Sequence, residues 1–283
     1  MPDPDRCRAT SAGGGAGAGG GVPARPGGCG AGRRTGPAAR RKTGLILSFL
    51  LAAVPTIIAI TLHEAAHGYA ALAMGDDTAR QAGRLSLNPL AHVDRFGTII
   101  LPGFLLVSQL LTIGRVGFMF GWAKPVPVSA WKFRDPRRGM MVVAAAGPAM
   151  NFLLAWIGAV LLHAVPFLRG GAETAALEFL FYFMLANLVL GIFNLIPLPP
   201  LDGGRIAVGL LPLPLARIWA RSERWGILIV LALLFVVPAL ARQAGYHFDP
   251  IRSLLGVVLD PALRLVLALA LHPPLGGVLL GDV

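Results

Sequence analysis

Long runs of hydrophobic residues, separated by short polar and basic stretches, divide most of this chain into segments of membrane-spanning length. A helix that crosses a bilayer needs about 20 predominantly apolar residues. Runs of this kind cover 44–73, 140–166, 175–201 and 225–241. Each of these four segments therefore predicts a transmembrane helix.

Two further hydrophobic segments fit a full crossing less well. The segment 97–114 contains Pro102 and Gly103, which interrupt a helix, and is expected to be re-entrant or a hairpin. The segment 254–271 is interrupted by Asp260, Pro261 and Arg264, so it is either a weaker sixth span or a helix along the membrane interface. The fold class is therefore an all-α polytopic membrane protein with about 5–6 transmembrane helices.

A short membrane-associated strand is expected at 117–128, in the sequence GFMFGWAKPVPV. Proline has no backbone N–H to give to a sheet, so Pro125 and Pro127 would confine this strand to a sheet edge.

Composition agrees with a membrane protein. Of the 283 residues, 55% are hydrophobic and 14% are charged, against about 25% charged residues in an average soluble domain. The net charge of +11 comes from basic blocks that flank the apolar runs, and no nucleic-acid motif accompanies them. We therefore expect a lipid bilayer, and no nucleic acid, as the partner of this chain.

The sequence HEAAH lies at the end of the first apolar segment. His63 and His67 are four residues apart, so they lie on one face of a helix, where both can bind one Zn²⁺. Glu64 is then placed to act as a base toward a water molecule. Such polar groups are costly inside an apolar segment and are usually functional there.

Asp202 is the candidate third ligand, in the sequence NLIPLPPLDGG at 194–204. The only two cysteines, Cys7 and Cys29, both precede the first apolar segment, so a metal would have to be held by histidine and carboxylate. The prolines before Asp202 end the helix, and unwound backbone at membrane depth must be buried in protein or line a wet cavity. The alternative is a proline–glycine helix stop with a surface aspartate, but the pairing with HEAAH favours the ligand.

HEAAH and NLIPLPPLDGG, in this order, resemble the site-2 protease family of intramembrane zinc metallopeptidases. Three further stretches support the resemblance: LNPLAHVDRFGT at 87–98, GWAKPVPV at 121–128 and AAAGPAMN at 144–151. The chain is similar to the compact bacterial branch of the family, which has no PDZ or CBS domain.

The resemblance also implies a division of the chain into three parts. Residues 44–210 would form the metallopeptidase core, and 211–283 would add C-terminal helices. Residues 1–43 are rich in Gly, Ala and Arg, cannot bury a hydrophobic core and are expected to be a disordered tail.

The roles of individual residues follow from the same resemblance. It implies that His63, His67 and Asp202 hold one zinc ion per chain and that Glu64 is the general base. The implied activity is hydrolysis of peptide bonds in or near transmembrane segments of other membrane proteins, as in regulated intramembrane proteolysis.

Four residues are candidates for binding the substrate. Asn151 and Asn194 are candidate donors to the oxyanion that forms during peptide hydrolysis. In the family, an Asn-x-x-Pro-x-Pro stretch holds an unwound substrate segment, and Asn194, Pro197 and Pro199 match that pattern.

The positions of the ligands constrain the topology. His63 and Asp202 both lie near the C-terminal ends of their apolar segments, so these segments should run in the same direction unless the zinc is reached from both ends. The basic loops 115–138 and 201–224 predict a site toward the cytoplasmic face of a bacterial inner membrane. The orientation of the N-terminus stays open, because a re-entrant 97–114 puts it outside while the basic tail favours the inside.

Two other functions fit parts of the sequence. A catalytically silent binding partner of the same fold need not keep all four residues of the site. A transporter would show matching helix breaks in both halves, and PLPPLDGG has no counterpart in the first half. His92 and Asp94 would form a second metal site, a set of groups that support the first metal site, or a hydrogen-bonded loop, and we favour the loop.

Overall fold

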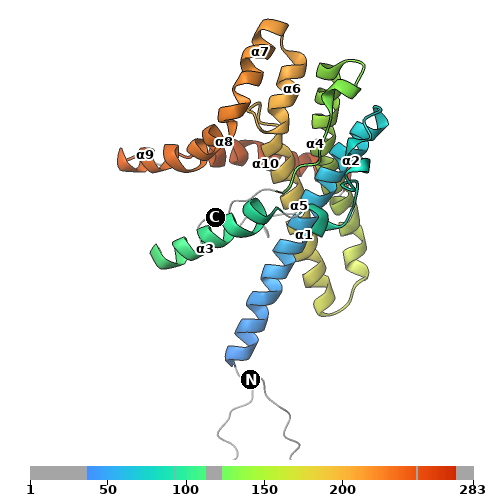
Figure 1. Ribbon diagram of the computed structural model, residues 1–283. Coiled ribbons are helices and arrows are strands. Elements are labelled where there is room, and N and C mark those ends of the chain that lie inside the picture. The colour runs from blue at the N-terminus through green and yellow to red at the C-terminus, as the bar shows by residue number, and fades with distance from the viewer. Residues whose placement is uncertain (1–36, 93, 113–122, 247, 272–283) are drawn as a thin grey trace, which may run out of the picture. The chain divides into compact units, whose positions relative to one another are not determined.

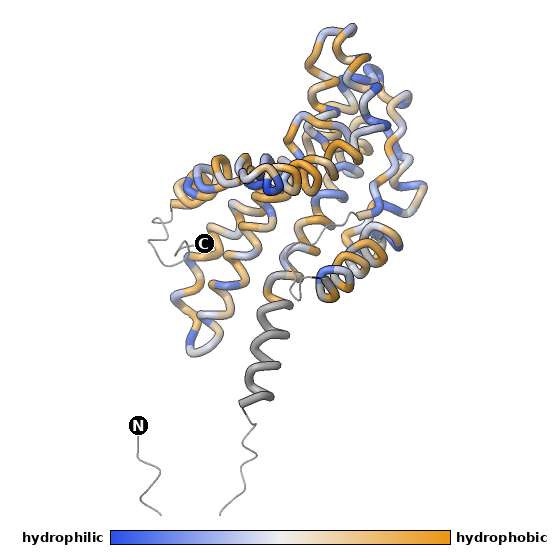
Figure 2. Tube along the Cα trace, turned by 90° about the vertical axis from the view of Figure 1, so that its left-hand side faces the viewer, coloured by the Kyte–Doolittle hydropathy of each residue, from blue (hydrophilic) through white to orange (hydrophobic). Residues whose placement is uncertain are grey.

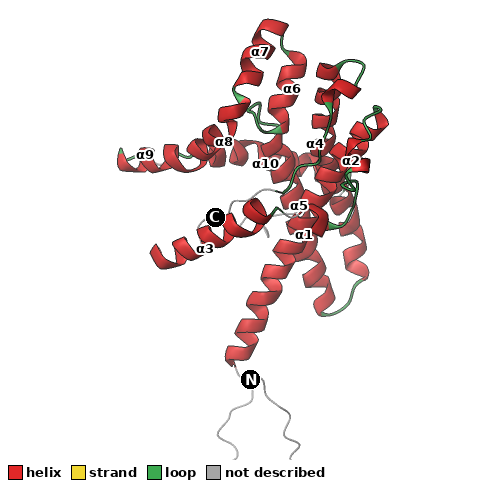
Figure 3. Ribbon diagram, in the orientation of Figure 1, coloured by secondary structure: helices red, strands yellow, loops and turns green. Residues whose placement is uncertain are grey.

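A computed structural model describes residues 37–92, 94–112, 123–246 and 248–271, and shows a helical protein (Figures 1 and 3). Within these residues no strand is found. The longer helices are α1 (Pro37–Ala73), α3 (Leu101–Thr112), α4 (Pro136–Leu161), α5 (Gly171–Asn194), α6 (Asp202–Leu210), α7 (Leu213–Arg221), α8 (Glu223–Leu231), α9 (Val237–Gln243) and α10 (Pro250–Leu269), and α2 (Thr78–Gln81) is a single turn. The expectation of a mostly helical membrane protein is confirmed.

Three helical stretches are long and apolar enough to cross a membrane: Pro136–Phe167, Gly171–Asn194 and Glu223–Gln243. They correspond to three of the four predicted spans, and Figure 2 shows that hydrophobic residues recur throughout the described helices. The fourth predicted segment, 44–73, lies within α1. The expected total of about 5–6 spans stays a prediction.

The predicted interruption at Pro102 and Gly103 does not break the helix there. A π-helical turn, Arg95–Ile100, leads directly into α3, and both residues lie inside α3. Asp94 accepts hydrogen bonds from the first backbone N–H groups of the π-helical turn, so it serves as the N-terminal cap. A re-entrant course for 97–114 stays a prediction, because 113–122 lie outside the described residues.

Helices α1 and α4 run antiparallel to each other. The Nδ1 atom of His67 contacts the carbonyl oxygen of Val143, and one helical turn earlier along α1 the Nδ1 atom of His63 contacts Asn151, further along α4. Helix α5 in turn packs antiparallel to α4, with Gly158 beside Phe183 and Gly191 beside Asn151. Helices α1 and α5 therefore run in the same direction, as the positions of His63 and Asp202 require.

The main core forms where α4, α5 and α10 meet. Small residues of α4 let the longer side chains of α5 come close. The fully buried members are Ala155, Ala159, Met184 and Leu188, and Val266 and Leu267 of α10 pack against the same cluster. This packing fixes α4 and α5, which carry the polar groups behind the histidines.

Helix α5 ends at Asn194, and α6 begins at Asp202 after a tight loop that contains a cis Pro199–Pro200 peptide bond. The loop folds back onto Gly203, where a Cβ atom would lie 2.3 Å from the carbonyl oxygen of Leu195. Backbone cannot move away as a side chain can, so the residue after Asp202 must be glycine. The predicted helix break before Asp202 is therefore present.

Arg137 holds the other end of α6 in place. Its Nε atom donates to the carbonyl oxygen of Val208 at 2.7 Å, and its guanidinium also donates to the carbonyls of Gly209 and Leu211. These carbonyls have no partner within α6, because they belong to its last turn or follow it. Arg137, in the first turn of α4, thus joins α4 to the helix that carries Asp202.

The expected strand at 117–128 is not found in its described half, and 117–122 lie outside the described residues. Residues 123–128 form a segment without regular secondary structure, and two of its N–H groups bond to separate partners. Lys124 donates to the carbonyl of His92 at 2.9 Å, and Val126 donates to the carboxylate of Glu64 at 3.2 Å. Pro125 and Pro127 have no N–H, so the segment cannot form a continuous ladder.

Asp76 fixes the end of this segment to the end of α1. Its buried carboxylate accepts from the Ser129 N–H at 2.6 Å and from the N–H and hydroxyl of Thr78, and lies 3.4 Å from Lys132 Nζ. Burial raises the pKa of Asp76, but the hydrogen bonds from Thr78 and Ser129 outweigh burial and hold the pKa below its usual value. Asp76 thus stabilises the fold as a carboxylate.

We predict that Asp76→Asn destabilises the protein by about 2 kcal/mol, because the new amide presents N–H to an N–H donor inside the fold. The pKa of Asp76 is lower in the folded than in the unfolded chain, so its stabilisation is complete above the unfolded pKa. It is lost as the pH falls through the folded pKa. Thermal unfolding in detergent at several pH values measures both effects.

Asp77→Asn is the matched control, because Asp77 is a neighbouring carboxylate that pairs with Lys132 at 2.6 Å outside the core. It should shift stability much less than Asp76→Asn, because solvent screens an exposed ion pair. Equal effects of the two substitutions would contradict the role assigned to Asp76.

Candidate metal centre

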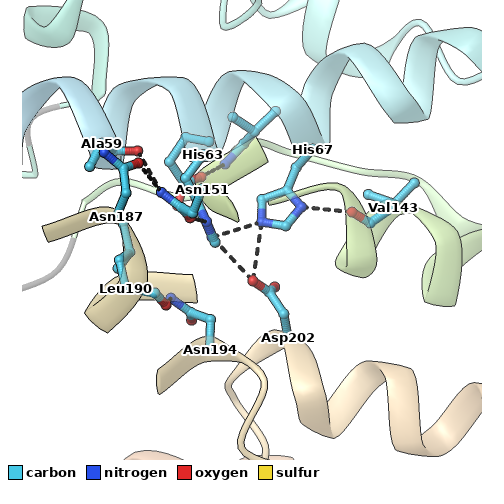
Figure 4. Close-up of polar contacts among 11 residues, drawn as sticks. Ala59, His63, His67, Val143, Asn151, Asn187, Leu190, Asn194 and Asp202 are labelled. Carbon is cyan, nitrogen blue, oxygen red and sulfur yellow. Dashed lines mark hydrogen bonds and ion pairs between the residues drawn. The ribbon is translucent and has the colours of Figure 1, made fainter. Parts of the chain in front are cut away.

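Three side chains from two distant parts of the sequence converge beside α4 (Figure 4). The Nε2 atoms of His63 and His67 lie 3.1 Å apart. The Oδ2 atom of Asp202 lies 3.1 Å from the first and 3.3 Å from the second. All three residues lie largely inside the protein. The structure thus brings together the three residues that the two sequence motifs singled out.

The proton positions on both imidazoles follow from their other contacts. His67 Nδ1 lies 2.7 Å from the carbonyl oxygen of Val143, which only accepts, so Nδ1 carries the proton. His63 Nδ1 lies 2.5 Å from Oδ1 of Asn151 and donates to it in the same way. Each neutral ring therefore keeps an unprotonated Nε2.

The orientation of Asn151 is fixed by a short chain of amides. Its Nδ2 donates to Oδ1 of Asn187 at 2.9 Å and faces the carbonyl oxygen of Ala59 at 3.4 Å. Asn187 in turn donates from its own Nδ2 to the carbonyl of Phe183 at 2.8 Å. Both asparagines are fully buried, so this chain presents only an oxygen to His63.

Three lone pairs therefore face one another in the centre of the cluster. The Oδ2 atom of Asp202 is buried and has no hydrogen-bond donor among the described residues. Acceptors at such distances repel one another unless a cation lies between them. Ligands of a tetrahedral zinc ion, with bonds of about 2.0–2.2 Å, lie about 3.3–3.6 Å apart. The donor set and its spacing fit a zinc ion held by His63, His67 and Asp202.

Gly147 lets α4 approach the two imidazoles. A Cβ atom at this position would lie 2.5 Å from Cε1 and Nε2 of His67 and 2.6 Å from Cε1 of His63. Such contacts are closer than packed atoms allow, so any side chain here would displace a ring. The glycine lies one turn from both Val143 and Asn151, and these three residues form one face of α4.

Glu64 lines a cavity of about 210 Å³ beside the cluster, together with His63 and Asn194. Its Oε2 accepts the Val126 N–H, which leaves Oε1 available to a water molecule. Asn194 donates from Nδ2 to the carbonyl of Leu190 at 3.0 Å, which orients its amide in the cavity wall. A base and an amide thus border the same space.

The other predicted residues lie elsewhere. Asn151 does not line this cavity and instead contacts His63 from behind. Pro197 is exposed, and Pro199 is buried and lines a separate cavity with Gly204. His92 bonds to the carbonyl of Ser86 at 2.8 Å and forms part of a hydrogen-bonded loop, as we favoured.

Several groups in the site were not found by sequence reasoning. The carbonyl of Val143 and the N–H of Val126 are backbone groups, which every residue carries, so no sequence signal marks them. Gly147 and Asn151 are four residues apart in AAAGPAMN, and that spacing was a usable sign that both face the same neighbour. Asn187 carried a comparable sign, as an amide inside an apolar helix.

The sequence model of Peptidase family M50 matches residues 169–237. YwhC of Bacillus subtilis (strain 168), whose name describes it as a candidate zinc metalloprotease, is 41% identical over 218 residues, which cover 74% of this chain and 93% of YwhC. Rip2 of Mycolicibacterium smegmatis, named in the same way, is 31% identical over 195 residues, or 69% of this chain and 70% of Rip2. No solved structure matches the chain.

A helical membrane protein with a buried His-His-Asp cluster beside a glutamate has the site of a metallohydrolase. Because the family model matches and the chain is 41% identical to YwhC over 93% of the length of YwhC, the chain belongs to peptidase family M50 and is a metallopeptidase.

We predict that Gly147→Ala weakens zinc binding about ten- to a hundredfold, the usual effect of disturbing groups that support metal ligands. Alanine is otherwise favourable in a helix, so the loss would come from the displaced imidazoles. Metal analysis of purified protein, dialysed against graded zinc buffers, gives the affinity.

Gly158→Ala is the control on the same helix, since its Cβ would meet only the side chains of Met184 and Phe183, away from the cluster. It should bind zinc like the unchanged protein. Normal zinc affinity in Gly147→Ala would contradict the packing described here.

Proposed function

We propose that this chain is an intramembrane zinc endopeptidase that hydrolyses peptide bonds in or near transmembrane segments of other membrane proteins. One observation carries the proposal: three buried acceptor atoms of His63, His67 and Asp202 face one another beside the carboxylate of Glu64. The relatives' names, which describe zinc metalloproteases, support zinc as the metal. One such cluster is found among the described residues, so we propose one zinc ion per chain.

Zinc in this site would act as a Lewis acid that polarises the peptide carbonyl and acidifies water. Glu64 supplies the base: one of its carboxylate oxygens takes a proton from water as the water oxygen attacks the carbonyl carbon. The same carboxyl group then gives that proton to the departing amine nitrogen as the C–N bond breaks. The Val126 N–H holds Oε2 and so orients the carboxylate for these transfers.

The surroundings of the site support a substrate from within the membrane. His63 lies inside the apolar helix α1 and Asn151 inside the apolar helix α4, and Asn194 is the last residue of the apolar helix α5. A helical substrate hides its peptide bonds, so the segment to be cut must be extended when it reaches Glu64. We assign Asn194 to contact with this extended segment, and Asn151 to the orientation of His63.

The basic loops favour one orientation in the membrane. Arg137 and Arg205 lie at the end of the helix bundle where α4 begins and where α6 follows α5. Loops rich in arginine and lysine stay on the cytoplasmic side of bacterial membranes. We therefore propose a multi-pass protein of the bacterial cell membrane with its site toward the cytoplasm.

We predict that Glu64→Gln keeps one zinc ion per chain but lowers peptide-bond cleavage about a thousandfold, because the amide cannot accept the proton. Zinc content and cleavage of a transmembrane substrate in proteoliposomes are measured on the same preparation. Removal of zinc by a chelator should abolish cleavage by the unchanged protein, and added zinc should restore it.

Glu178→Gln is the control, because Glu178 is an exposed glutamate on α5, outside the cavity. It should keep both zinc and cleavage. If Glu64→Gln cleaves as fast as the unchanged protein, Glu64 is not the base.

A further inference from the structure

Two apolar grooves flank α1 next to the site. The α1–α4 groove, of about 480 Å³, is lined by residues of α1 such as Leu62 and Ala66 and by residues of α4 such as Ala149 and Leu153. The α1–α5 groove, of about 310 Å³, lies on the other side of α1. It is lined by Thr56, Ala59, Ile60, Tyr182, Leu185, Ala186, Val189, Leu190 and Phe193.

Of the two, the α1–α5 groove borders the catalytic cavity. Ile60, Leu190 and Phe193 line both spaces. The α1–α4 groove shares none of its described lining residues with that cavity. The reason is the tight contact of Gly147 with both imidazoles, which closes the α4 side of the histidines.

The lining residues form two parallel stripes that end at the site. Thr56 and Ile60 are eight and four residues before Glu64, so they lie on the same face of α1. On α5, Tyr182, Ala186 and Leu190 repeat at the same spacing and lead to Asn194. Because α1 and α5 run in the same direction, both stripes point the same way, and each extends roughly 12–18 Å along its helix.

We infer that the α1–α5 groove binds the membrane-spanning segment of the substrate and leads its unwound end to Glu64; this inference rests on the proposed peptidase function. No charged side chain is among the described residues that line the groove, so it suits an apolar helix and not a polar peptide. Ala59 and Ala186 have short side chains, so neither narrows the groove. Small residues of this kind let helices approach closely in membranes.

Ala186→Leu tests the inference, because it fills the groove two turns before Asn194. Two rates are measured for each variant. The first is the rate of cleavage of a transmembrane substrate in proteoliposomes, and the second is the rate of cleavage of a short soluble peptide with the same scissile bond. We expect the ratio of the first rate to the second to fall about tenfold, while the zinc content stays at one per chain.

Ala149→Leu is the matched control, since it adds the same side chain to the α1–α4 groove. It should leave the ratio unchanged. An unchanged ratio in Ala186→Leu, or a reduced ratio in Ala149→Leu alone, would overturn the assignment. A wild-type protein that binds zinc and cleaves neither substrate would instead refute the proposed peptidase function.

A second measurement does not depend on catalysis. A photo-crosslinking amino acid is placed at Val189 in one Glu64→Gln variant and at Leu153 in another, one in each groove. We expect the transmembrane substrate to crosslink from position 189 and not from 153. Crosslinks from 153 alone, or crosslinks from 189 only to lipid or to a second copy of this chain, would contradict the inference.

Discussion

The structure depends on a constraint of proton placement: three acceptor atoms meet, and no proton lies between them. The Nδ1 protons of His63 and His67 are bound on the far side of each ring, one by Asn151 and one by the Val143 carbonyl. The Nε2 lone pairs and Asp202 Oδ2 are therefore left facing one another. With both rings neutral, such an arrangement is unfavourable unless a cation shares it, so the fold is suited to hold a metal ion at this point.

Helix α4 imposes this constraint, although it contributes no ligand. Val143, Gly147 and Asn151 follow one another at single-turn spacing and face His67 and His63 on the antiparallel α1. The Val143 carbonyl accepts the Nδ1 proton of His67, and Asn151 accepts that of His63. Gly147, between them, leaves room for both rings. The arrangement resembles the carboxylate- or carbonyl-supported histidines of other metal sites, where the supporting groups matter nearly as much as the ligands.

Much of the ligand set could be predicted from the sequence, because the i, i+4 spacing of His63 and His67 is a property of any helix. The approach of Asp202 required the resemblance between whole motifs, since 135 residues separate it from His67 and no periodicity links them. The role of Asn151 could not be predicted, because an asparagine in an apolar helix can bond to substrate or to another side chain. The expected strand at 117–128 is absent from its described half, where alternate prolines lack N–H groups and the N–H groups of Lys124 and Val126 bond to His92 and Glu64.

The contact of Arg137 with the end of α6 has a mechanical consequence. Helix α6 has nine residues, so it is about 13 Å long and too short to bend appreciably. Asp202 begins this helix, and the carbonyls at its other end are bonded to Arg137. A rigid rod anchored at one end transmits a displacement to the other, so the position of the carboxylate in the site is set partly by a guanidinium that never touches it.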